Sequence, residues 1–451
     1  MDEKAIKMTT QPVEGLIAKL ALPSIISMLV TTFYNMADTY FVSTMDNTSV
    51  TGAVGVVFSL MAIIQAFGFF FGHGSGNYIS RSMGAGDRRT SEIVASIGFF
   101  GAFIVGCIIM IFGLAFKEKL AYMLGATETI YPYAKEYMTY ILLGAPFMCA
   151  SLVINNQLRF QGNASFAMIG ITTGAILNCI LDPLLITTFN MGIRGAAIAT
   201  IIGQFVSFVL LLWGAHKSDN VKISIKNFIP KSKYLLKILN GGFPSLCRQG
   251  ISSLGTIYLN HIAGGYGDFA ITGMTICSRV IMFLNSAMIG FGQGFQPVCG
   301  YNYGARKYDR VSKAFWFCVK SSFAFLVVVS LCGALFAENI VKMFSEDLLV
   351  IKFGSATFRA MCIAFPLNSW IVMSNMTLQT TGKAVRASII AAARQGIVLV
   401  PVIFNMNSLF KLNGLVYTQM VSDIITFLIA VPFQMSFLKE IRIEVANSDN
   451  L

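Results

Sequence analysis

Apolar runs long enough to cross a lipid bilayer recur along the whole chain, and short polar stretches separate them. A helix needs about 20 residues to cross a hydrocarbon core of about 30 Å. We therefore predict an all-α polytopic membrane protein with twelve transmembrane helices. The predicted spans are residues 16–41, 52–79, 91–116, 132–155, 164–189, 195–214, 237–263, 269–297, 312–335, 355–378, 387–405 and 414–435.

A polar and basic stretch follows the sixth predicted span and divides the chain into two halves. We predict a first lobe over residues 1–215, a cytoplasmic linker over 216–236 and a second lobe over 237–451. The halves repeat each other at an offset of about 220 residues, and such an internal duplication is typical of transporters. The register places FGHG (71–74) over FGQG (291–294), MGAGDRR (83–89) over YGARKYD (303–309), Pro23 over Pro244, Pro146 over Pro366, and Gly162 over Gly382.

The charge balance agrees with a membrane protein. Only 12% of the 451 residues are charged and 55% are hydrophobic, whereas an average soluble domain is roughly 25% charged. A net charge of +12 would favour nucleic-acid binding in a soluble protein. If both termini are cytoplasmic, about twenty of the 33 basic residues, Arg159 among them, fall in inner loops and tails. The charge then reflects membrane orientation, and we expect no nucleic-acid partner.

The motifs of several other protein classes are absent from the sequence. It has no GxxxxGK(S/T), no HExxH and only three histidines, so we expect no enzymatic activity, no cofactor and no ATP-driven transport. All nine cysteines except Cys299, which we place in a loop at a helix end, fall inside predicted spans without metal-ligand spacing. We also expect no cleaved signal peptide before the first span.

Two acidic residues of the first half, Asp38 and Asp182, lie inside predicted spans. Ionisable groups in hydrocarbon cost on the order of 2.5 to 3.5 kcal/mol, so each is a functional hypothesis. With a rise of about 1.5 Å per residue, Asp182 lies roughly 27 Å and Asn178 roughly 21 Å from the cytoplasmic start of their span. Asp38 and Thr200 also fall in the outer half of the membrane, so the four residues can converge.

Two carboxylates, an amide, a hydroxyl and a backbone carbonyl near Ala196 form an oxygen-rich set suited to Na+ or to a shared proton. Two close carboxylates out of water cannot both stay ionised without a counter-charge. The alternative is that Asp182 only satisfies backbone groups freed by Pro183 and that Asp38 is a helix-end residue. Pro23, early in the first span, is either an ordinary packing kink or a hinge that lets this helix bend.

The second half does not repeat this acidic set. Its approximate equivalents of Asp38, Asn178, Asp182 and Thr200 are Tyr258, Val398, Val402 and Met420. Instead, Arg248, Arg279, Arg394 and Asp423 lie close to the predicted midplane. They form either a structural network between helices or a cleft wall that attracts anions.

Several further polar residues in the spans are candidates for contact with a substrate. Each of them could equally bridge helices, and the histidines at span positions, His73 and His261, favour packing or capping roles. The candidates are Gln65, Asn155, Asn156, Asn375 and Gln379.

Five stretches resemble the multidrug and toxic compound extrusion (MATE) family, and the likeness covers nearly the whole chain. They are NMADTYFVS (35–43), SRSMGAGD (80–87), RFQGNA (159–164), NCILDPLLI (178–186) and GIRGAAIAT (192–200). FGHGSGNYISRSMG (71–84) is most similar to a MepA-like bacterial branch. The resemblance implies two six-helix lobes around a V-shaped cleft. It also implies a first-lobe cation site at Asp38, Asn178, Asp182 and Thr200, with Tyr137 nearby.

These observations predict a multi-pass protein of the bacterial cytoplasmic (inner) membrane, with both termini inside, that acts as a secondary antiporter. The resemblance implies export of amphipathic, often cationic drugs in exchange for Na+ or H+, by a monomer. A flippase or exporter of a lipid-linked or anionic metabolite is the alternative. We expect a flippase to carry basic groups in the cleft of both lobes, and the first lobe shows no mid-span cation.

Overall fold

The computed structural model describes residues 3–43, 48–217 and 220–448, so residues 218 and 219 of the predicted linker lie outside the described residues. The described residues form helices and no strand. The first half contains α1 (Glu3–Thr10), α2 (Val13–Ser43), α3 (Thr48–Gly84), α4 (Arg88–Ala115), α5 (Lys117–Met123), α6 (Tyr131–Phe160), α7 (Ala164–Pro183), η1 (Leu184–Thr188) and α8 (Ile193–Lys217). The second half contains η2 (Ile225–Asn227), α9 (Ser232–Gly264), α10 (Asp268–Gly304), α11 (Tyr308–Leu335), α12 (Ala337–Lys342), α13 (Leu348–Ala364), η3 (Phe365–Leu367), α14 (Asn368–Thr380), α15 (Ala384–Ala392), η4 (Ala393–Ile397) and α16 (Leu399–Ser448).

The all-α prediction with twelve spans is confirmed, although three spans are built from more than one segment. The fifth is α7 and the π-helix η1, the tenth is α13 and α14 joined by the 3-10 turn η3, and the eleventh is α15, the π-helix η4 and the first part of α16. Lys411 has non-helical backbone (φ 52, ψ −130), and this bend separates the eleventh span from the twelfth inside α16. Among the described residues, ten helices are long and apolar enough to cross a membrane, with α16 counted once.

Several helices extend further than the hydropathy pattern predicts. α6 continues to Phe160 and α10 to Gly304. Arg159 and Cys299, which we placed in loops, are therefore helical, and both are buried. The helices continue through polar residues there because the neighbouring helices cover them.

Turn geometry confirms the internal repeat. Gly162 and Gly382 follow α6 and α14 with φ of 81° and 83°, and Gly86 and Arg306 follow α3 and α10 with φ of 80° and 58°. Left-handed backbone at the residue that follows the C-cap is a common way to end a helix. Four helix ends in matching register thus close in the same way, even where the second half has arginine in place of glycine.

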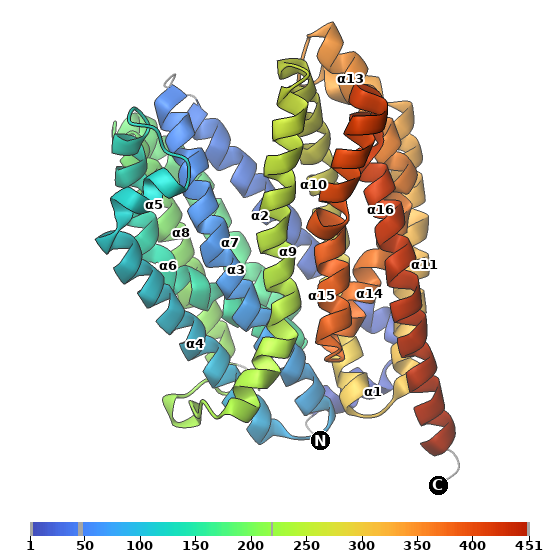
Figure 1. Cartoon of the computed structure of the whole chain (residues 1–451). Coiled ribbons are helices and arrows are strands. Elements are labelled where there is room, and N and C mark those ends of the chain that lie inside the picture. Colours follow the sequence, from blue (N-terminus) through green and yellow to red (C-terminus); the bar gives the residue numbers. More distant parts are fainter. Residues whose placement is uncertain (1–2, 44–47, 218–219, 449–451) are drawn as a thin grey trace.

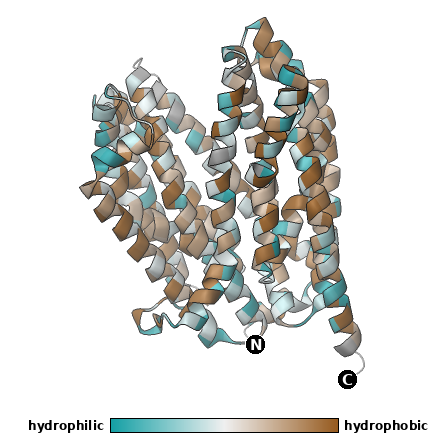
Figure 2. Cartoon of the chain, in the orientation of Figure 1, coloured by the Kyte–Doolittle hydropathy of each residue, from teal (hydrophilic) through white to brown (hydrophobic). Residues whose placement is uncertain are grey.

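In Figure 1 the elements α2 to α8 and the elements α10 to α16 form two groups that lie closest at the end holding both termini. The first spanning helix of each lobe packs on the second spanning helix of the other lobe: α2 packs on α10, and α9 packs on α3. Hydrophobic residues occur along most of the length of the helices (Figure 2). Exposed side chains such as Ile111, Phe112 and Phe325 suit contact with lipid.

The two groups touch through a reciprocal glycine contact at the end of the molecule that holds the termini. A Cβ at Gly84 would collide with the backbone carbonyl of Tyr301, and a Cβ at Gly304 would collide with that of Arg81. Helix α1 covers the same end, where Asn302 donates to the Met8 carbonyl at 3.1 Å and Lys307 to the Thr9 carbonyl at 2.9 Å. In the turn that follows α3, hydrogen bonding from Thr90 holds the pKa of Asp87 below its usual value.

We predict that Gly304→Ala and Gly84→Ala each destabilise the folded protein by about 1–3 kcal/mol, the usual range for overpacking. The neighbouring atom in both cases is backbone, which cannot rotate away. Thermal unfolding of the purified protein measures the effect. Gly55→Ala in α3 is the matched control, because nothing lies within 4 Å of its new methyl group. Equal melting temperatures for Gly304→Ala and this control would refute the contact.

Candidate functional site

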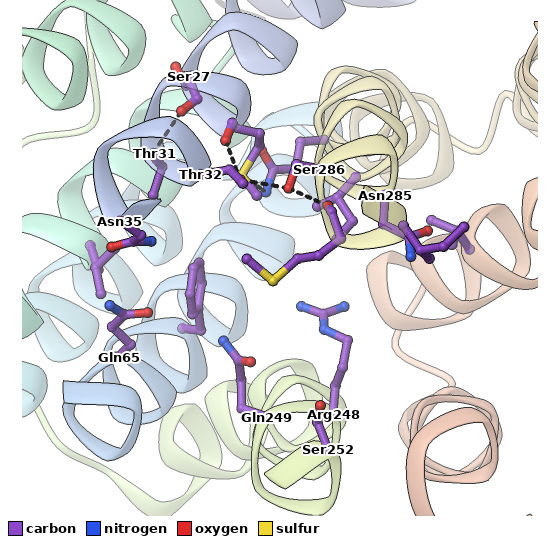
Figure 3. A pocket seen from close by; sticks show the side chains of 18 of the residues that line it. Ser27, Thr31, Thr32, Asn35, Gln65, Arg248, Gln249, Ser252, Asn285 and Ser286 are labelled. Atoms are coloured by element: carbon purple, nitrogen blue, oxygen red, sulfur yellow. Dashed lines mark hydrogen bonds between the residues drawn. The ribbon is translucent and has the colours of Figure 1, made fainter. Parts of the chain in front are cut away.

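A cavity of about 710 Å³ lies between the two groups of helices and is lined by both. Its wall combines apolar side chains such as Met28, Phe69 and Met376 with many amides and hydroxyls. Figure 3 shows Gln65 on one side and Arg248 and Gln249 on another, all directed into the same space. Seven of the predicted cleft residues line it, namely Gln65, Asn155, Arg248, Arg279, Asn375, Arg394 and Asp423, whereas the candidates Asn156 and Gln379 are not part of its lining.

Three of the predicted first-lobe site residues are joined by hydrogen bonds between α7 and α8. The amide of Asn178 lies 3.1 Å from Asp182 Oδ2 and, through its oxygen, 3.1 Å from the backbone nitrogen of Thr200. The Thr200 hydroxyl donates to the carbonyl of Ala196 at 3.0 Å. Asn178 and Asp182 face the same way because they are one helical turn apart. Asp182 is fully buried.

Asp38, on α2, belongs to the same cluster. It lies close enough to Asp182 for a direct electrostatic interaction, and its Oδ1 is buried without a hydrogen-bond partner among the described residues. The hydroxyl of Tyr137, from α6, is also buried without such a partner and lies near Asp38. The structure thus brings all six predicted residues of the site together.

This cluster has the chemistry to hold a small cation. Neither carboxylate is neutralised by a basic side chain within the described part of the chain. An unpartnered carboxylate oxygen, a second carboxylate, an amide and a hydroxyl are hard oxygen donors that suit Na+ or a proton. Asp182 hydrogen-bonds Asn178 rather than backbone freed by Pro183. The backbone nevertheless changes its helix geometry after Pro183, where α7 passes directly into the π-helix η1.

Pro23 lies where the two lobes cross. It is inside α2, which stays helical from Val13 to Ser43, and its flanking backbone packs on α10. A Cβ at Gly290 would meet the backbone at Ile25, and one at Gly294 the backbone at Ala21. The missing proline N–H therefore weakens the helix ladder of α2 beside a tight interhelical contact.

In the second lobe, the structural interpretation is correct for one arginine of the three. Arg394 Nε lies 3.2 Å from Asp423 Oδ1, and the pair joins the π-helix η4 to α16. Gln419 and Asn368 also donate to this carboxylate, at 3.1 and 3.5 Å. Asp423 is therefore neutralised by Arg394 and held by two amides.

Arg248 and Arg279 have no such partner. Within the described ranges neither forms an ion pair or a hydrogen bond, and Arg248 projects from α9 into the cavity (Figure 3). Arg159 of α6 also lines the cavity and hydrogen-bonds Gln293 of α10. Arg159 lies one residue before the end of α6 and is not a mid-span cation, but it gives the cavity wall a basic group from the first lobe that we did not predict.

The neutral candidates mainly bridge helices. Asn155 donates to the Ala167 carbonyl at 3.0 Å, and Asn375 donates to the Ala387 carbonyl at 2.6 Å, which is the same contact in each repeat. Gln379 donates to Ser245 at 2.8 Å. Ser245 also lies 3.0 Å from Nδ1 of His73, which lines the cavity.

Sequence reasoning missed two residues that matter for these sites. Tyr34 lines the cavity next to Asp38 and Asp182, and its position one turn before Asp38 was a signal that could have found it. Arg159 was missed because it follows the most hydrophobic part of its span. In a helix that is covered by other helices, polar residues near the end do not show where the helix stops.

The family model MatE matches residues 23–184 and 244–405, two segments that together cover well over half of the chain. The segments begin at Pro23 and Pro244, a pair that the predicted repeat register makes equivalent. "Multidrug export protein MepA" of Staphylococcus aureus strain MRSA252 is 27% identical over 431 residues, covering 95% of each chain. The protein of the same name from Staphylococcus saprophyticus is 28% identical over 414 residues, covering 91% of each.

Solved structures are similar over nearly the full length. One, described as the outward-facing conformation of a multidrug resistance MATE family transporter of the MOP superfamily, has a TM-score of 0.92 and 25% identity, and covers 98% of this chain and 99% of that one. A MOP superfamily transporter from Pyrococcus furiosus, described as having a binding pocket of reverse polarity, has a TM-score of 0.91 at 25% identity, with the same coverage. Its description adds that this polarity suggests a different function. This chain, a membrane protein that crosses the bilayer many times, belongs to the MatE family of multidrug efflux transporters.

Proposed function

We propose that the protein is a secondary antiporter that exports amphipathic organic compounds from the cytoplasm in exchange for Na+ or H+. The observation that carries this proposal is the pair Asp38 and Asp182, two membrane-embedded carboxylates without a basic partner in the described structure. Groups of this kind are costly in a membrane unless they bind an ion or a proton. Cationic drugs, which the resemblance noted in the sequence implies, are among the expected substrates.

Coupling requires the ion and the substrate to favour different arrangements of the same helices. Asn178 and Thr200 line the cavity and also contact the carboxylate cluster. Asp38 is on α2, which carries Pro23 and packs on α10 of the other lobe. Cation binding at Asp38 would therefore change the preferred position of α2, and with it the contact between the lobes. Alternating access of the two lobes follows from this linkage.

A second candidate is a flippase or exporter of a lipid-linked or anionic metabolite. Arg159 in the first lobe and Arg248 in the second both line the cavity. Basic groups in the cleft of both lobes are what we expect of such a protein. This observation therefore supports the second candidate, whereas the sequence argued against it.

We predict that Asp38→Asn and Asp182→Asn each abolish gradient-driven export and leave the protein folded, because each removes a carboxylate that would carry the coupling ion. The measurement is efflux of a cationic dye from proteoliposomes, with a pH gradient and a Na+ gradient imposed separately. The gradient that drives wild-type efflux identifies the coupling ion.

Glu346→Gln is the matched control for these substitutions. It makes the same chemical change at an exposed position outside the candidate spans, and we expect normal efflux. Normal melting temperatures for the two aspartate variants would separate loss of coupling from loss of fold. Undiminished efflux in both variants would remove the support for this coupling site.

The hinge proposal gives a further prediction. Pro23→Ala restores a backbone donor and straightens the local ladder of α2, so we expect slower transport, at least several-fold, with substrate affinity nearly unchanged. Comparison of initial efflux rates with equilibrium substrate binding separates the two quantities. Pro432→Ala, in α16, controls for proline removal from a spanning helix. A normal rate for Pro23→Ala would identify Pro23 as an ordinary packing residue.

A further inference from the structure

The charges on the cavity wall do not balance. Four arginines line the cavity, namely Arg159, Arg248, Arg279 and Arg394, whereas Asp423 is the single carboxylate among the described residues that line it. Asp423 already pairs with Arg394 at 3.2 Å. Asp38 and Asp182 are not part of the wall. Three guanidinium groups therefore face the cavity without a carboxylate.

Arg159 is the most deeply buried of these groups, with only 4% of its surface exposed. Its two terminal nitrogens donate to the side-chain oxygens of Gln293 and Asn156, which are both neutral. Its Nε is buried with no hydrogen-bond partner in the described parts of the chain. A buried charge that meets only neutral groups is poorly compensated, and it attracts an anion strongly.

Arg248 approaches from the other lobe. It lies on α9, beside Gln249 and one turn before Ser252, and Figure 3 shows these side chains on the same wall of the pocket. Both Arg248 and Arg159 act electrostatically on His73, which lies on α3 and lines the same cavity. The two guanidinium groups thus share one region, although they belong to different lobes.

We propose that Arg159 and Arg248, with Arg279 in the same cavity wall, form a binding subsite for an anionic group on the exported molecule. The inference rests on the proposed export function, because the subsite lies in the cavity that would hold the substrate. Guanidinium groups bind carboxylate, sulfonate and phosphate through paired hydrogen bonds. Phe69, Met28 and Met376 in the same wall suit an apolar body. The subsite therefore adds amphipathic anions and zwitterions to the substrates expected of the proposed function.

A structural role for these arginines is the alternative. It fits Arg394, which joins two elements through a carboxylate. It partly fits Arg159, which joins α6 to α10 through Gln293. It does not fit Arg248, which makes no hydrogen bond or ion pair within the described residues. Arg248 is therefore the residue that tests the subsite with the smallest disturbance of the fold.

The test compares two probes that share their aromatic rings and differ in charge. Anilinonaphthalenesulfonate carries a sulfonate, and phenylnaphthylamine is its uncharged counterpart. Binding to the full chain in lipid nanodiscs is measured by titration calorimetry, with empty nanodiscs subtracted. The variants are Arg248→Gln, Arg248→Lys and Arg159→Gln. Arg442→Gln, at an exposed position near the end of α16, removes one charge outside the cavity.

We expect Arg248→Gln to raise the Kd of the sulfonate about tenfold or more, as loss of a charge-assisted hydrogen bond does. Arg248→Lys should recover part of this affinity because it keeps the charge and loses the paired geometry. The uncharged probe should bind all variants equally, and Arg442→Gln should resemble the wild type.

Two results would overturn the subsite. One is unchanged sulfonate affinity in both Arg248→Gln and Arg159→Gln. The other is an equal loss for both probes, which would mean that the arginines support the shape of the cavity and not its charge. Efflux of a cationic dye by the wild type tests the export function separately. Absence of gradient-driven efflux together with charge-dependent sulfonate binding would refute the proposed function and keep the subsite.

Discussion

A charged side chain within a bilayer must find its counter-charge or its proton inside the protein, because lipid supplies neither. This constraint organises the interior of both lobes. In the second lobe Asp423 meets Arg394 and is satisfied by protein alone. In the first lobe Asp38 and Asp182 lie near each other with no basic partner among the described residues, so a proton or a cation would have to neutralise them. A carboxylate paired with an arginine holds two helices together. A carboxylate without a basic partner can bind and release a proton or a cation.

Comparison of the two lobes shows which features of the repeat are the same in both and which differ. The left-handed turns at Gly162 and Gly382, and the amide contacts of Asn155 and Asn375, are the same in both lobes. These contacts determine how the helices end and pack. The buried charges are not repeated, because they depend on single side chains that can change without altering the helix path. Asp182 and Asp423 nevertheless both lie where the fifth and sixth spans of their lobe meet.

Much of the fold and of the first-lobe cluster could be predicted from the sequence. Hydropathy and rise per residue were enough to place Asp182, Asn178 and Thr200 in the same half of the membrane, because the rise per residue is constant along a regular helix. The sequence pattern did not predict changes of helix geometry, such as the π-helix η4 around Arg394. It also fails at helix ends such as Arg159, since the other lobe, and not the residue itself, decides whether that position is solvated. Contacts between the lobes cannot be predicted from the hydropathy pattern of one helix alone.

The glycine contact between the lobes has a consequence for how this end of the molecule can open. Gly84 rests on the backbone at Tyr301, and Gly304 rests on the backbone at Arg81, so each half of the contact positions the other. Backbone atoms cannot give way gradually as long side chains do, and such a contact is either made or lost. The two halves must therefore separate together. We therefore expect the end of the protein that holds both termini to be either closed, with both glycine contacts made, or open, with both lost, and to have no stable intermediate.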